Sequence, residues 1–194
     1  MFVISVLGKQ VPCVFDPSLT DSGKQTAALT GATGLANAVN AVQAQLTDAQ
    51  TQAFIGVDQV VFFESVIFHH ASMTRPFMDQ ENATFYWEID EFLAPGVAYG
   101  ARRPTFYFHD SWHLAQYRAT GRMSNDLQEE VDREVDATQR QLEVAQVLGC
   151  DAAFIAYLDE YLHNRDEITA RIGQGFQAGA AQSRCCSKPV TTPV

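Results

Sequence analysis

Residues 105–138 read TFYFHDSWHLAQYRATGRMSNDLQEEVDREVDAT, and this stretch contains two runs of helical periodicity on either side of a glycine. Thr105 to Thr120 is the first run, and Gly121 marks its end because glycine adopts the left-handed conformation that closes many helices. Ser124 has the side chain of a helix N-cap and opens the second run, which extends to Leu148. The stretch therefore predicts two consecutive helices joined by a short turn.

The rest of the chain predicts strands and a long helix before these two helices and a third helix after them. Gly149 closes the second helix, and a third periodic segment runs from Asp151 to Ile172. Residues 2–15 have the pattern of two short strands or a hairpin. The Ala- and Gln-rich run from Lys24 to Phe54 predicts one long amphipathic helix, and the β-branched and aromatic run from Asp58 to Phe63 predicts a buried strand.

Residues 71–104 have the weakest pattern of the chain. They hold three prolines and two glycines around the aromatic run Thr84 to Phe92, which predicts an irregular region carrying one or two strands. The predicted layout is α+β, with strands and one long helix first and three helices last. A length of 194 residues suits one core. We therefore expect a single domain over residues 1–175 and a flexible tail over residues 176–194.

The charge balance excludes one broad class of partner. The chain has 13 Lys and Arg residues against 23 Asp and Glu residues, a formal net charge of -10 and a pI near 4.8. Such a surface repels phosphate on average, so electrostatic binding to nucleic acid or to anionic lipid is disfavoured. We expect no nucleic-acid partner and no membrane partner.

The N-terminus and the cysteines indicate a compartment. Residues 1–7 lack a positively charged leader and a cleavage site, and no stretch reaches the roughly 18 apolar residues that span a bilayer. The four cysteines match neither a disulfide framework nor a paired CxxC zinc site; they are Cys13, Cys150, Cys185 and Cys186. These features predict a soluble, cytoplasmic protein in a reducing compartment.

Two histidines carry the first chemical signal. His109 and His113 are four residues apart in a predicted helix, so both imidazoles lie on one face, one turn apart. Two imidazoles in this arrangement can bind the same metal ion. The spacing, with an acidic residue directly after the first histidine, therefore predicts half of a divalent metal site.

The next helix offers a third ligand. Glu134 lies three residues after Val131 and four before Thr138, on the face that we assign to the core. A carboxylate buried there without a partner costs several kcal/mol, and a metal ion would supply the partner. Reversal of the chain near Arg122 brings Glu134 to the depth of the histidines. Glu130, one turn earlier, is the alternative ligand or a hydrogen-bonding partner of a histidine.

The pattern 109-HDSWH-113 with 134-EVDA-137 resembles the HExxH plus downstream Glu arrangement of the gluzincin branch of the zincin metallopeptidases, which includes small domains in bacterial toxins and effectors. The upstream order of a long helix and strands resembles the minimal zincin fold, so the resemblance covers roughly residues 25–150. It implies a zincin-like α+β domain with zinc held by His109, His113 and Glu134. It further implies hydrolysis of a peptide or protein substrate by a zinc-activated water.

The chain departs from that family at one position. The family's general base is a Glu, and here Asp110 stands there with a side chain one methylene shorter. Proton transfer needs hydrogen-bond contact, so the departure predicts weakened hydrolysis or metal binding without efficient turnover. Tyr117 is a candidate for stabilising an oxyanion, and Tyr157 and His163 on the last helix are alternatives among which the sequence does not select.

Three other interpretations remain open at this point. The two histidines are ordinary helix residues in the first, with Glu134 in a salt bridge to Arg118 or Arg133. The second is a ferritin-like di-metal carboxylate bundle, with ligands drawn from Glu64, Asp110, His113, Glu134, Glu160 and His163. A mismatch in depth weakens it, because Glu134 lies farther from the turn at Gly149 than Glu160 does. The third is a non-enzymatic acidic interaction protein.

Overall fold

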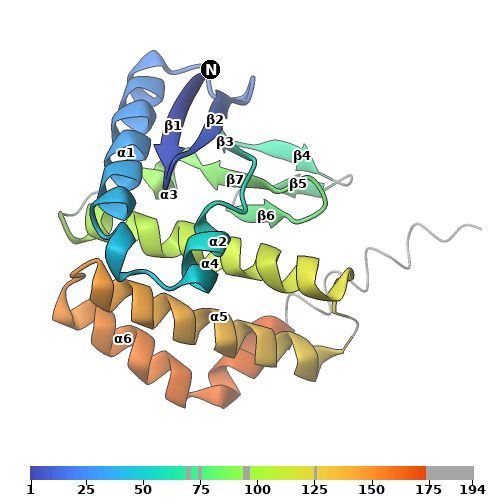
Figure 1. Ribbon diagram of the computed structural model, residues 1–194. Helices are drawn as coiled ribbons and strands as arrows, with labels where there is room; N and C mark the ends of the chain where they lie inside the picture. The colour runs from blue at the N-terminus through green and yellow to red at the C-terminus, as the bar shows by residue number, and fades with distance from the viewer. Residues whose placement is uncertain (69–70, 74–75, 94–96, 125, 174–194) are drawn as a thin grey trace, which may run out of the picture.

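The computed structural model describes residues 1–68, 71–73, 76–93, 97–124 and 126–173. A sheet and a pair of helices lie on opposite sides of one long helix, α4 (Val97–Thr120), which runs through the middle of the molecule (Figure 1). Helices α5 (Leu127–Val147) and α6 (Ala152–His163) lie on the side of α4 away from the sheet. The predicted α+β class is confirmed.

The main sheet has the strand order β1-β2-β3-β7-β6. β1 (Phe2–Val6) and β2 (Lys9–Phe15) form the expected hairpin, which turns at Leu7 and Gly8 with φ angles of 50° and 84°. β3 (Gln59–Phe63) runs parallel to β2 and to β7 (Thr84–Glu88), and β6 (Phe77–Asp79) pairs antiparallel with β7 at one edge. A separate hairpin consists of β4 (Val66–Phe68) and β5 (Ala71–Met73).

The predicted single helix from Lys24 to Phe54 is wrong in its length. The structure divides it into α1 (Ser22–Ala41), a short 3-10 turn η1 (Gln43–Gln45) and α2 (Asp48–Phe54). The cause is a capping box: the Thr47 hydroxyl accepts a hydrogen bond from the Gln50 backbone N–H, and the Gln50 side chain accepts one from the Thr47 N–H. This local chemistry starts a new helix within an apolar pattern that continues across the break.

The expected start of the central helix is also wrong, because α4 begins at Val97 and contains Pro104. A proline in a helix removes one backbone hydrogen bond. The helix continues through it because the following turn packs completely: Thr105, Tyr107 and Phe108 have no exposed surface. The irregular region expected over residues 71–104 contains β5, β6 and β7, and its aromatic run ends in the short helix α3 (Ile89–Phe92).

The ends of the last three helices agree only in part with the prediction. Gly121 and Gly149 follow α4 and α5 with φ angles of 68° and 67°, as expected for left-handed helix ends. The N-cap of α5 is Asp126 instead of Ser124, since its carboxylate accepts the Gln128 N–H at 3.0 Å. The predicted helix from Asp151 to Ile172 is interrupted at Asn164, and residues 165–173 are helical again.

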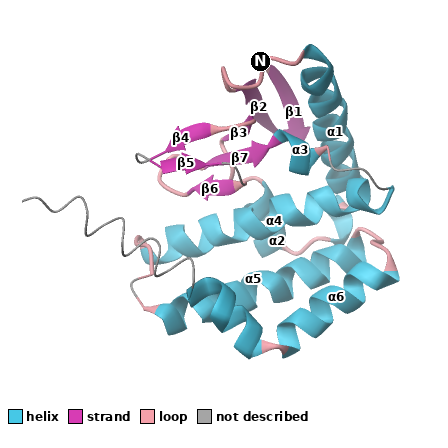
Figure 2. Ribbon diagram, turned by 180° about the vertical axis from the view of Figure 1, so that it is seen from behind, coloured by secondary structure: helices cyan, strands magenta, loops and turns pink. Residues whose placement is uncertain are grey.

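The largest core cluster lies between the sheet, α1, α2 and α4, and smaller clusters join α5 to α6 and to the residues that follow. Figure 2 shows the arrangement of these elements from behind. Helix α4 contributes Tyr107, Phe108 and Leu114 to the main cluster, all with no exposed surface. Its other side contacts α5. The two faces of α4 therefore have different roles, since one supports the fold and the other supplies polar side chains.

No helix in the described ranges is long and apolar enough to cross a membrane. The expected tail over residues 176–194, with Cys185 and Cys186, lies outside the described residues.

Gly31 and Gly34 of α1 provide a matched test of this packing. A Cβ at Gly31 would lie 2.7 Å from Cε1 of Phe92, whose ring is fully buried against Phe62 and Trp87. We expect Gly31→Ala to lower the free energy of unfolding by about 1–3 kcal/mol. Gly34→Ala meets nothing within 4 Å and should raise it by about 0.5–1 kcal/mol. Urea unfolding measures both, and equal effects would contradict the packing of α1 on α3.

Candidate metal centre

His109 and His113 lie one turn apart on the face of α4 that contacts α5. The opposite face carries Tyr107, Ser111 and Leu114, which have no exposed surface. Burial of that face fixes the rotation of α4 and directs both imidazoles toward α5. Glu134 of α5 meets them there, and the side chains of the three residues are only 16–18% exposed.

The three ligand atoms form a compact triangle. Nε2 of His113 lies 3.1 Å from Nε2 of His109 and 3.2 Å from Oε2 of Glu134, and His109 Nε2 lies 3.4 Å from the same oxygen. Ligands bound at about 2.0–2.1 Å in a tetrahedron lie about 3.3–3.4 Å from one another. The predicted ligand set is therefore brought together with nearly the spacing that one divalent ion requires.

A hydrogen-bond chain fixes the orientation of the His113 ring. The side-chain amide of Gln116 donates to the Arg133 carbonyl at 3.0 Å and to Oδ2 of Asp136 at 2.9 Å. Its oxygen therefore faces Nδ1 of His113, at 2.9 Å, and accepts the proton that this nitrogen carries. In the neutral ring Nε2 is then unprotonated, and its lone pair points toward His109 and Glu134.

The close approach of the two imidazoles and the carboxylate shifts the pKa values of His113 and Glu134. Burial lowers the pKa of His113, but the hydrogen bond and the charge of Glu134, with the charge of Asp110, raise it above its usual range. Burial raises the pKa of Glu134, but hydrogen bonds to His109 and His113 outweigh it and hold the value far below the usual range. A positive charge at the centre of the triangle, whether a proton or a metal ion, is thus strongly favoured.

The second ring nitrogen of His109, Nδ1, differs from Nε2 in its surroundings. Among the described residues, Nδ1 of His109 is buried without a hydrogen-bond partner, and so is the hydroxyl of Thr138. The antiparallel register of α4 and α5 pairs Thr105 with Gln141 and His113 with Glu134. Thr138 is one turn after Glu134, and His109 is one turn before His113. In this antiparallel register, the Thr138 hydroxyl on α5 and His109 Nδ1 on α4 therefore lie at facing positions. A bridging water between them would satisfy both.

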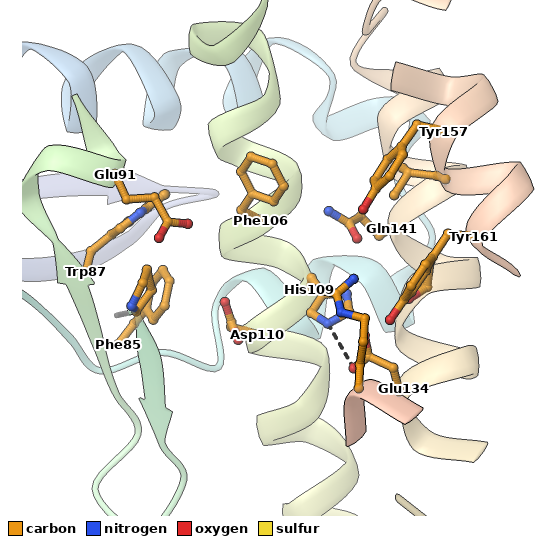
Figure 3. Close-up of a pocket in the computed structure, with 14 residues that line it drawn as sticks. Phe85, Trp87, Glu91, Phe106, His109, Asp110, Glu134, Gln141, Tyr157 and Tyr161 are labelled. Atoms are coloured by element: carbon orange, nitrogen blue, oxygen red, sulfur yellow. Dashed lines mark ion pairs between the residues drawn. The ribbon is translucent and has the colours of Figure 1, made fainter. Parts of the chain in front are cut away.

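Asp110 lies beside the triangle on a shared cavity. The cavity of about 190 Å³ is bordered by His109, Asp110 and Glu134, by Phe85 and Trp87 of β7, and by residues of α6 (Figure 3). Burial raises the pKa of Asp110, an effect that the charges of His109 and His113 oppose and that of Glu134 reinforces. In the described part of the chain, Asp110 has no ion pair with a Lys or Arg.

The tyrosine and histidine side chains that the sequence offers as oxyanion donors differ in their position relative to the cavity. Tyr117 does not line the cavity, whereas Tyr157 does, and the His163 side chain is 80% exposed and faces Asp159. Tyr161 and Arg171 line the cavity as well, and sequence reasoning missed both. Tyr161 is four residues after Tyr157, so the helical spacing of the two tyrosines was a signal that could have identified the pair.

The residues that only the alternative interpretations use have other surroundings. Glu64 forms an ion pair with Lys24, Glu160 is exposed, and Arg118 pairs with Asp58. Arg133 pairs with Glu129. Glu130 contributes no atom to the triangle, so Glu134 is the carboxylate that joins the two histidines.

No protein-family model, no curated protein and no solved structure matches the chain.

The metal-free site has a defined pH dependence. The raised pKa of His113 contributes stability that is present below about pH 6.5 and is lost as the pH rises through the folded-state value. The lowered pKa of Glu134 contributes stability above about pH 4.5 that is lost as the pH falls through its folded-state value. In chelator, we therefore expect the stabilising effect of the pair to be larger near pH 5.5 than near pH 8.

Thermal unfolding of the wild type and Glu134→Gln at these two pH values measures the effect. The substitution should remove the pH-dependent difference, whereas His163→Gln, at an exposed histidine, should preserve it. Zinc should reverse the trend, because metal binding needs unprotonated imidazole. A wild type and a Glu134→Gln variant with parallel pH profiles would contradict the pairing.

Gln116 provides a test of the ring orientation. Gln116→Leu removes the acceptor for His113 Nδ1, and loss of such a partner typically lowers metal affinity by about 10–100-fold. Competition with a chromophoric chelator measures the affinity. Gln139→Leu, at an exposed position of α5, is the control and should leave it unchanged. Equal affinities of the two variants would show that Gln116 does not orient the ligand.

Proposed function

We propose that this chain is a zinc-binding, metallopeptidase-like hydrolase in which His109, His113 and Glu134 hold the metal ion and Asp110 acts on the attacking water. One observation carries the proposal: three ligand atoms lie 3.1–3.4 Å from one another, and two of the residues that supply them, His109 and Glu134, border a cavity that the carboxylate of Asp110 also lines. Two imidazoles and one carboxylate with an open position form a ligand set used by catalytic zinc.

The chemistry divides between the ion and the side chains. Bound zinc would lower the pKa of a water molecule and polarise the peptide carbonyl. Asp110 would accept the proton of that water, because its carboxylate borders the same cavity as His109 and Glu134. Tyr161, whose pKa burial raises to about 12, stays protonated and can donate a hydrogen bond to a developing oxyanion.

The edge of the sheet supports a peptide as substrate. Pro76 lines the cavity, and β6, which follows it directly, is an edge strand of the main sheet. An extended peptide can add to a sheet edge through backbone hydrogen bonds. Such binding would place the peptide along the wall of the cavity that contains the metal ligands.

A second candidate function is metal binding without efficient turnover, and the short side chain of Asp110 favours it. Substitution at this position separates the two. Asp110→Asn should keep the zinc and lose hydrolysis of a fluorogenic peptide library, whereas Asp110→Glu should increase the rate by lengthening the base. His113→Ala should lose both zinc and hydrolysis.

Elemental analysis and peptide cleavage on the same samples measure these outcomes. A zinc-loaded wild type and an Asp110→Glu variant that are both inactive on every peptide would overturn hydrolysis and leave metal binding. Full zinc content in the His113→Ala variant would overturn the site itself. Iron in place of zinc would indicate the other chemistry that uses two histidines and one carboxylate.

A further inference from the structure

Arg171 is an exception to the charge pairing of the chain. Most lysine and arginine side chains of the described residues have a carboxylate within 4.0 Å: Lys9, Lys24, Arg102, Arg118, Arg122, Arg133, Arg140 and Arg165. Within that part of the chain, Arg171 forms no such ion pair, although the formal net charge is -10 and carboxylates are abundant. An arginine kept from ion pairing in an acidic protein is available to an anion from outside.

Two tyrosines lie beside the Arg171 side chain on the cavity wall. Its guanidinium carbon lies 5.2 Å from the ring centroid of Tyr161. The two tyrosine rings are stacked, with centroids 6.3 Å apart. Contacts with aromatic rings position a guanidinium without neutralising it. The charge is therefore retained and its position is defined.

These three side chains belong to the wall of the metal cavity. Tyr157, Tyr161 and Arg171 line the same cavity as His109 and Glu134. Figure 3 shows Tyr157 and Tyr161 on one side of the His109 and Glu134 pair, with Asp110 and Glu91 on the other. Tyr157 is 53% exposed, so this wall is open to a ligand.

The Thr138 hydroxyl is a second polar group on the same cavity. Thr138 is 1% exposed, lines the cavity and has a hydroxyl without a hydrogen-bond partner. Gln141, 4% exposed, is next to it on α5. A buried hydroxyl without a partner costs free energy, which a polar ligand or a bound water offsets. This observation is independent of the charge of Arg171.

We propose that Arg171, with Tyr157 and Tyr161, binds a carboxylate of the peptide substrate beside the metal ion. The inference rests on the proposed function and adds a substrate class: peptides whose carboxylate, on an acidic side chain or at the C-terminus, lies near the scissile bond. Guanidinium and carboxylate match in geometry and form two parallel hydrogen bonds. The rest of the acidic surface repels such a group, so the preference depends on this one side chain.

Small metal-binding probes test the inference without reference to turnover. The probes are alkyl hydroxamates of increasing length that end in a carboxylate, each compared with its uncharged carboxamide, titrated calorimetrically into zinc-loaded protein. The best carboxylate should bind at least about tenfold more tightly than its carboxamide, as expected for a charged hydrogen-bonded pair. Arg171→Gln should abolish this ratio without changing zinc content or carboxamide binding.

Arg165→Gln is the matched control, because Arg165 belongs to the same helical segment and pairs with Asp132. This variant should bind the carboxylate probe more tightly than its carboxamide by the same factor as the wild type. Equal binding of carboxylate and carboxamide by the wild type, or a ratio that survives in Arg171→Gln, would overturn the inference and leave the zinc site intact. Failure of every hydroxamate to bind zinc-loaded protein would instead overturn the open metal position, and the inference with it.

Peptides identify the source of the carboxylate. A peptide with a free C-terminus, its C-terminal amide and an amide that carries an internal Asp can each compete with the best hydroxamate. Stronger competition by either acidic peptide than by the neutral amide supports the inference and names the source. Equal competition by all three peptides would contradict it.

Discussion

The antiparallel contact between α4 and α5 is the constraint on which the site depends. Its register joins Gln116 to Arg133, His113 to Glu134 and Thr105 to Gln141. One face of α4 is fixed in the main core by aromatic and aliphatic side chains, so the opposite face has no freedom to turn away from α5. The three ligand atoms converge as a consequence of this packing. Such preorganisation lowers the entropic cost of binding a metal ion.

The electrostatics of the site follow from this convergence. Glu134 is held at low pKa in a buried position only because two imidazoles face it. The same carboxylate without them would be costly to bury. Gln116 and Asp136 extend the network away from the cavity and leave His113 Nε2 directed at the centre. On the cavity side, Asp110 lies on one side of the His109 and Glu134 pair, and Tyr157 and Tyr161 lie on the other, with Arg171 over the Tyr161 ring. In the proposed enzyme, Asp110 acts as the base on one side of the metal ion, and Arg171 binds the substrate carboxylate on the other.

The sequence predicted the helical core of the site better than its surroundings. Two features sufficed to predict the ligand set: the spacing of His109 and His113, and the position of Glu134 on the apolar face. Both are local properties of regular helices. The breaks at Thr47 and Asn164 were missed, since capping side chains there override an apolar periodicity that continues. Pro104 was expected to precede α4, but tertiary packing of Tyr107 and Phe108 carries the helix through it. Arg171 could not be assigned to the cavity, because its place depends on how residues 165–173 fold back on α6.

The most direct test of the account is the position of the metal ion in crystals of the zinc-loaded chain, measured by anomalous diffraction at the zinc absorption edge. The account predicts one strong peak about 2.0–2.1 Å from Nε2 of His109, Nε2 of His113 and a carboxylate oxygen of Glu134. A peak bound by other side chains, or no peak at all from protein incubated with zinc, would contradict the metal centre and the hydrolase proposal that depends on it.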